Sequence, residues 1–146
     1  MGSWRDSLSP QAQQGVDVLL NESLPFGQRM LEEHGEFFPY AVAMSASGEV
    51  EIFGAQIGPD ENPPSGKVLD VLYEGLRSRR DSIRAAAVVS DVVVREPGET
   101  EAIRIEIEHR EGVALTVLLP YEKASHPRRV RYGDLQAMPA SRRVWS

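Results

Sequence analysis

The clearest pattern of apolar and polar positions lies between Ile103 and Tyr121. Isoleucines at 103, 105 and 107 alternate with charged residues at 104, 106 and 108, which is the period of a strand with one buried and one solvent-facing side. Arg110 to Gly112 then predict a turn, and Val113 to Leu119 predict a more buried return strand. We expect Pro120 to end the pairing, because proline has no N–H to donate. The pattern therefore predicts a β-hairpin.

Three other segments have helical spacing. Ser9-Pro10 predicts a helix start, with apolar residues recurring at helical spacing as far as Leu20. Pro25 predicts the start of a second, short helix, which Gly35 ends. A third, amphipathic helix is predicted from Gly66 to Arg80. Its apolar face is formed by Val68, Leu69, Leu72, Tyr73 and Leu76.

Further strands are predicted at 37–45, 49–56 and 85–95, with a loop at 58–66 and a turn at 96–99. Short connections between most of these strands favour antiparallel pairing. The sequence thus predicts an α+β fold: a five-stranded, mostly antiparallel sheet with two N-terminal helices and one crossover helix. The same order of elements occurs in roadblock and profilin-like folds, and this topological resemblance implies no function.

Length and charge indicate one domain with a distinct tail. The chain has 146 residues, of which 41% are hydrophobic and 26% charged, which is enough for one buried core. We predict a single domain over residues 1–124 and a basic tail over 125–146. Residues 120–146 have a net charge of +4, whereas the whole chain has −6. The tail also contains apolar residues such as Val130 and Trp145, so we expect it to dock on the domain.

Several classes of protein are excluded or disfavoured by composition. The chain has no cysteine, which excludes disulfides, thiolate metal sites and cysteine nucleophiles. No apolar run approaches the roughly 20 residues that span a bilayer, and the segment from Met1 to Asp6 lacks the apolar core of a signal peptide. We therefore predict a cytoplasmic protein with no membrane partner.

No motif predicts a metal or a cofactor. The three histidines, His34, His109 and His126, have no second histidine at ligand spacing. Gly66-Lys67 lacks the upstream glycine and the following hydroxyl residue of a phosphate-binding loop, and no dinucleotide fingerprint follows a predicted strand. We predict no cofactor.

The densest group of polar residues surrounds the end of the strand at 103–109. Glu106 and Glu108 point to the same side, about 6.6–6.8 Å apart along the strand, and His109, Arg110 and Tyr121 are the remaining candidates for a binding site. Two carboxylates at this spacing suit acid–base chemistry. The competing interpretation is a solvated strand face, where such charges serve solubility and cross-strand pairing. No residue is assigned a catalytic role.

Four segments resemble a family of small uncharacterised bacterial proteins. They are residues 36–40 (EFFPY), 47–49 (SGE), 107–112 (IEHREG) and 119–121 (LPY), and the resemblance extends over about 24–132. It implies a cytoplasmic bacterial protein with a single α+β domain. It implies no activity, ligand or catalytic residue.

The lead hypothesis is a non-enzymatic protein-interaction or regulatory domain, acting through a protein partner or by self-association into a homo-oligomer. An open sheet edge invites such pairing. The alternative is a small-molecule-binding protein or weak enzyme that uses Glu106, Glu108 and His109. Nucleic-acid binding by the basic tail ranks last, because the body of the chain is acidic.

Overall fold

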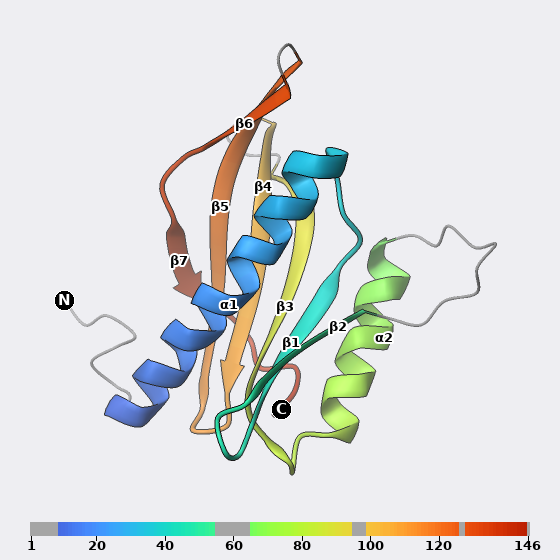
Figure 1. Ribbon diagram of the computed structural model, residues 1–146. Helices are drawn as coiled ribbons and strands as arrows, with labels where there is room; N and C mark the ends of the chain where they lie inside the picture. The colour runs from blue at the N-terminus through green and yellow to red at the C-terminus, as the bar shows by residue number, and fades with distance from the viewer. Residues whose placement is uncertain (1–8, 55–64, 95–98, 126–127, 146) are drawn as a thin grey trace.

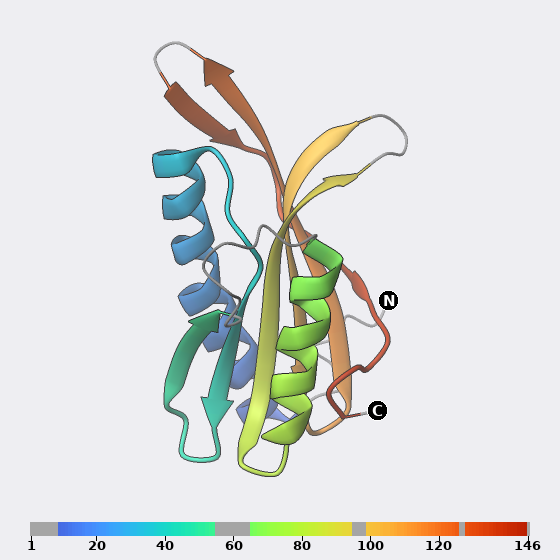
Figure 2. The same cartoon turned by 90° about the vertical axis from the view of Figure 1, so that its right-hand side faces the viewer.

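An antiparallel sheet with one helix on each face forms the framework of the protein (Figures 1 and 2). The structure is a computed structural model, and it describes residues 9–54, 65–94, 99–125 and 128–145. Its described part contains two helices and seven strands, in the sheet order β2-β1-β3-β4-β5-β6, with β7 also paired to β5. The elements are α1 (Pro10–His34), β1 (Tyr40–Ser45), β2 (Val50–Gly54), α2 (Ser65–Ser78), β3 (Ile83–Val94), β4 (Thr100–His109), β5 (Val113–Ser125), β6 (Arg128–Tyr132) and β7 (Gln136–Pro139).

The two predicted N-terminal helices are one helix, α1, so the prediction of three helices is wrong. Pro25 lies inside α1, at an interior position where proline costs about 3 kcal/mol. The helix continues because its buried stripe continues. Residues on this stripe recur every four positions on both sides of the proline, at Leu19, Ser23, Gly27 and Leu31, while Pro25 itself is exposed. Packing of this stripe on the sheet outweighs the local penalty.

Both predicted ends of the N-terminal helical region are confirmed. The Ser9 hydroxyl accepts a hydrogen bond from the Ala12 N–H at 3.1 Å, which caps the first turn. Gly35 ends the helix with φ of 79°, and its N–H donates to the Leu31 carbonyl.

The predicted hairpin forms as β4 and β5, with Ile105 opposite Val117. Pro120 does not end the strand, however, and that prediction is wrong. β5 continues to Ser125 because it changes partner: pairing with β4 ends at Tyr121, and pairing with β6 begins at the same residue. Pro120, which has no backbone N–H, directly precedes Tyr121, the residue at which the pairing partner changes.

The described sheet has seven strands rather than five, because β6 and β7 add two strands to one edge. β6 pairs with the second half of β5 and β7 with the first half. Of the other predictions, the turn at 96–99 and the loop at 58–66 lie mainly outside the described residues, and α2 begins at Ser65. Neither described helix is long and apolar enough to cross a membrane.

A separate apolar core fills each face of the sheet. The core under α1 joins residues such as Val16 and Leu19 to odd-numbered residues of β4. The core under α2 joins Leu72 and Leu76 to Val88 of β3. Strand alternation therefore decides which helix each sheet residue faces.

Candidate functional site

The alternation of β4 separates the five candidate residues predicted from the sequence. Glu106 and Glu108 lie on the α2 face, whereas His109 and Tyr121 lie on the α1 face. Arg110 is exposed in the turn after β4, and its N–H donates to the Arg84 carbonyl at 3.0 Å. The structure therefore brings Glu106 and Glu108 together but does not gather all five residues into one pocket.

Glu108 holds the C-terminal segment of the chain. Its side chain is only 5% exposed. Both carboxylate oxygens accept the Val144 N–H at 3.0 Å, and one also accepts the Trp145 N–H at 3.3 Å. Arg77 adds a hydrogen bond of 2.7 Å from Nε to the Arg143 carbonyl. Backbone N–H groups of the C-terminal segment thus already bond to both oxygens of this carboxylate.

Glu106 is also engaged by neighbouring side chains. The buried Tyr73 hydroxyl donates to it, and Arg104 Nε lies 3.4 Å from one of its oxygens. Burial raises the pKa of Tyr73, and the negative charge of Glu106 adds to the shift. The Arg143 guanidinium lies 3.7 Å from the Tyr73 ring centroid and covers that ring. This group ties β4, α2 and the C-terminal segment together.

His109 is a buried neutral side chain. It is 2% exposed, and its Nδ1 accepts the Glu111 N–H at 3.1 Å, so the neutral ring holds its proton on Nε2. Burial lowers the pKa of His109. Nε2 has no hydrogen-bond partner among the described residues, and it faces Gly15 of α1, where an added Cβ would lie 3.5 Å away.

A small hollow lies on the Gly15 side of α1. Its volume is about 150 Å³, and Gly15 and Met44 line it together with Gln11, Gln14 and Arg84. His109 is not among the lining residues, although its ring lies 3.4 Å from the position of an added Cβ at Gly15. Helix packing, rather than ligand contact, accounts for its position.

Tyr121 is paired with Asp91 on the α1 face. Its hydroxyl donates to Asp91 Oδ1 at 2.5 Å. Burial raises the pKa of Asp91, while this hydrogen bond lowers it, and burial together with Asp91 raises the pKa of Tyr121. The pair lies on the face of the sheet opposite to Glu106 and Glu108.

A larger hollow, which the sequence patterns did not indicate, lies beside the edge strand β2. Its volume is about 280 Å³. It is lined by residues of β1, of β2 and the turn before it, of the turn after α2, and of the start of β3, among them Ser45, Glu49, Glu51, Arg79, Ser82 and Ile83.

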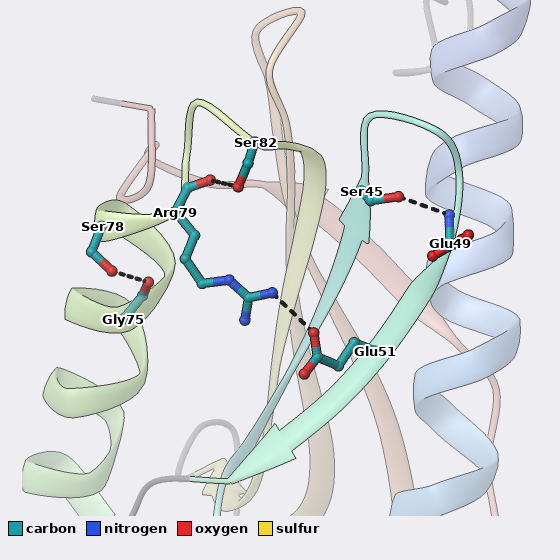
Figure 3. Close-up of polar contacts among 7 residues, drawn as sticks. All are labelled: Ser45, Glu49, Glu51, Gly75, Ser78, Arg79 and Ser82. Carbon is teal, nitrogen blue, oxygen red and sulfur yellow. Dashed lines mark hydrogen bonds and ion pairs between the residues drawn. The ribbon is translucent and has the colours of Figure 1, made fainter.

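The polar side chains around this hollow bond to one another. Figure 3 shows Arg79 reaching across to Glu51 on β2, with a distance of 2.9 Å between Nη2 and Oε2. The Ser45 hydroxyl accepts the Glu49 N–H at 3.1 Å, and the Ser82 hydroxyl donates to the Arg79 carbonyl at 2.9 Å. These contacts fix the hollow's shape and present no activated nucleophile.

The outer edge of β2 is open in the part of the chain that the structure describes, since no described strand pairs with it. Ser45 N–H donates to the Glu49 carbonyl at 2.8 Å, so every second pair of the β1–β2 ladder is hydrogen-bonded, including Ala43–Glu51 and Ala41–Phe53. The backbone N–H and C=O groups of the intervening residues then point away from β1. These residues are Val50, Ile52 and Gly54.

The opposite edge of the sheet has features that discourage pairing. β6 presents the exposed side chains of Arg129 and Arg131, and β7 ends at Pro139. Like charges and proline are common protections of edge strands. β2 contains neither proline nor a basic residue, and its Ile52 side chain is 39% exposed. Among the described residues, the β2 edge therefore has no paired strand, whereas the opposite edge has basic side chains and a proline.

No group of three or more potential metal ligands occurs within the described ranges. Within the described residues, the fold is an α+β fold of two helices and a seven-stranded antiparallel sheet, and no described strand pairs with the outer edge of β2. Comparison of the chain with protein-family models, with curated proteins and with solved structures finds no match in any of the three. The likeness to a bacterial protein family stays a prediction.

Proposed function

We propose that the protein is a non-enzymatic interaction domain that binds an extended protein segment along the outer edge of β2. The observation that supports this most directly is the open ladder of Val50, Ile52 and Gly54 beside the exposed Ile52 side chain. Adding a strand to such an edge is a recurrent mode of peptide recognition, in which backbone hydrogen bonds give affinity and side-chain pockets give specificity.

The hollow of about 280 Å³ would serve as the side-chain pocket that gives this mode of recognition its specificity. It opens on the α2 face next to Glu51, and alternate side chains of an added strand would fall on that face. Its lining mixes Arg79 with Glu49 and Glu51, so it would favour a polar side chain.

The alternative, a small-molecule site at Glu106, Glu108 and His109, has less support. Its two carboxylates already accept hydrogen bonds from the C-terminal segment and from Tyr73, and His109 lies on the other face of the sheet. The likeness in element order to roadblock and profilin-like folds also stays a prediction, and it adds no function by itself.

A peptide selection tests the proposal. Peptides selected from a phage-displayed random library against the immobilised protein are titrated into the isotope-labelled protein and followed by NMR. We expect the amide signals of Val50, Ile52 and Gly54 to shift and their hydrogen exchange to slow.

The matched variants are Ile52→Pro, which removes one outward-facing N–H, and Val71→Ser, which changes an exposed apolar residue on α2. Binding should be lost in the first and retained in the second. In a monomeric chain, equal binding to both variants, or shifts confined to another surface, would overturn the proposal.

A further inference from the structure

We infer that the strand added to β2 is β2 of a second copy of this chain, paired antiparallel about a two-fold axis at Ile52. This inference rests on the proposed function, because it names the partner of the same edge. A symmetric pair forms from one surface only if that surface is complementary to itself. The β2 edge meets this condition in backbone hydrogen bonding, in charge and in apolar contact.

The backbone pattern selects the register. With Ile52 on the axis, Ile52 lies opposite the partner's Ile52, and Val50 lies opposite the partner's Gly54. All three residues with outward-pointing N–H and C=O groups then face residues of the same kind, so every open group of the described edge has a partner. An axis at Glu51 or at Phe53 would pair only two of the three.

Charge excludes one of these neighbouring registers. An axis at Glu51 would place two identical carboxylates directly opposite each other, which is destabilising in a sheet. The axis at Ile52 instead places Glu51 opposite the partner's Phe53. Arg79 lies 5.2 Å from the Phe53 ring centroid and 2.9 Å from Glu51 of its own chain. Each Glu51 would therefore meet the Arg79 of its own chain and approach the partner's Arg79.

The α1 face of the same edge supplies the apolar contact. Ile52 points to this face, together with Val50, and directly opposed residues of an antiparallel pair have Cβ atoms about 4.5–5.5 Å apart. The exposed Ile52 side chain would be covered by its symmetry mate. Charge pairing on one face and apolar contact on the other thus agree on a single register.

A charge-complementation experiment tests the axis. A side chain on the axis meets its own copy, so Ile52→Lys and Ile52→Glu each place two like charges opposite each other. We expect the wild-type chain to be a dimer by light scattering, each variant alone to be a monomer, and an equimolar mixture of the two variants to be a dimer. The control pair is Val71→Lys and Val71→Glu on α2, which should leave the wild-type dimer unchanged.

Cross-linking gives a second measurement that does not depend on weakening the dimer. Because the chain has no cysteine, Ile52→Cys introduces a single thiol on the axis. A short bismaleimide linker should convert this variant to covalent dimers, whereas Val71→Cys should stay uncoupled under the same conditions. Circular dichroism of each variant verifies that the fold is retained.

The outcomes separate the two proposals. A wild-type monomer whose β2 edge still binds selected peptides would overturn self-pairing and leave the interaction domain standing. A dimer that survives Ile52→Lys, or variants that do not combine on mixing, would also overturn the register at Ile52. A monomer with no edge-binding peptide would overturn both.

Discussion

Glu108 and Val144, 36 residues apart in the chain, are joined by two hydrogen bonds of 3.0 Å from one backbone N–H to both oxygens of one carboxylate. Val144 is 1% exposed in the core beneath α2. A buried carboxylate near the end of β4 therefore anchors the last described residues of the chain to the sheet. Hydrogen bonds with a charged acceptor are stronger than neutral ones.

Replacing Glu108 by glutamine should loosen this anchor. We expect Glu108→Gln to lower the free energy of unfolding by about 1.5–3 kcal/mol, because a charged acceptor of buried N–H groups is lost. The measurement is urea denaturation followed by tryptophan fluorescence, and the Trp145 emission should shift to longer wavelength in the variant. Glu122→Gln, at an exposed position of β5, is the control and should change the free energy by less than about 0.5 kcal/mol. Equal stability of the two variants would contradict the anchoring role.

Two glycines of α1 should respond oppositely to alanine. At Gly27 an added Cβ would lie 2.8 Å from the Tyr40 hydroxyl oxygen, and that hydroxyl is fixed by donating to the Ser23 carbonyl at 2.6 Å. Gly27→Ala should therefore destabilise the protein by about 1–3 kcal/mol through overpacking.

At Gly15 the nearest atom would lie 3.4 Å away, in ordinary contact. Gly15→Ala should be neutral or stabilising by up to about 1 kcal/mol, because alanine favours the helix. Thermal unfolding of both variants checks the contrast, which fails if both glycines tolerate alanine equally.

His109 should make the stability pH-dependent. Burial lowers its pKa in the folded state below the ordinary value of 6.5, so between the two pKa values the unfolded state binds more protons than the folded state. Stability from this group is therefore complete above the unfolded pKa and is lost as the pH falls toward the folded one. The free energy of unfolding of wild type should drop as the pH falls below the ordinary histidine pKa of 6.5, and His109→Gln should reduce that drop. An unchanged pH profile in the variant would show that another group causes it.

Tyr121 and Asp91 should be energetically coupled. Tyr121→Phe removes the hydrogen bond that lowers the pKa of the half-buried Asp91 carboxyl, and Asp91→Asn removes the charge. We expect a double-mutant cycle in urea to give a coupling of about 0.5–3 kcal/mol. Additive effects of the two substitutions would mean that the contact contributes nothing to stability.

Local sequence patterns predicted most of the elements, because strand alternation and helix ends are determined by residues that are close together in the sequence. The alternation around Ile105 predicted a strand and its buried face, and Ser9 and Gly35 predicted the limits of the N-terminal helical region. Pro25 misled the prediction, because its local penalty is overcome by a buried stripe that only tertiary packing makes effective.

The candidate site was harder to predict because it depends on long-range contacts. The sequence placed Glu106 and Glu108 on one solvent-facing side of a strand. The structure confirms that they share a side, but the prediction of solvent exposure is wrong, because α2 and the C-terminal segment cover that side and Glu108 is buried. Nothing near Glu108 in the sequence indicates that the Val144 N–H would donate a hydrogen bond to its carboxylate. The edge position of β2 likewise follows from β1 pairing with β3, where Tyr40 lies opposite Val89, and no local pattern at 50–54 encodes it.

The position of Val144 also has a consequence for the order in which the two apolar cores would be completed during protein synthesis. Fully buried residues of the core beneath α1 extend along the chain to Tyr121, with the partly buried Val130 and Tyr132 packed against them, whereas the core beneath α2 includes Val144. A chain emerging from the ribosome, where earlier segments are free to fold first, would close the α1 face first. The α2 face, and with it the burial of Glu108, would be completed only after Val144 and Trp145 had emerged.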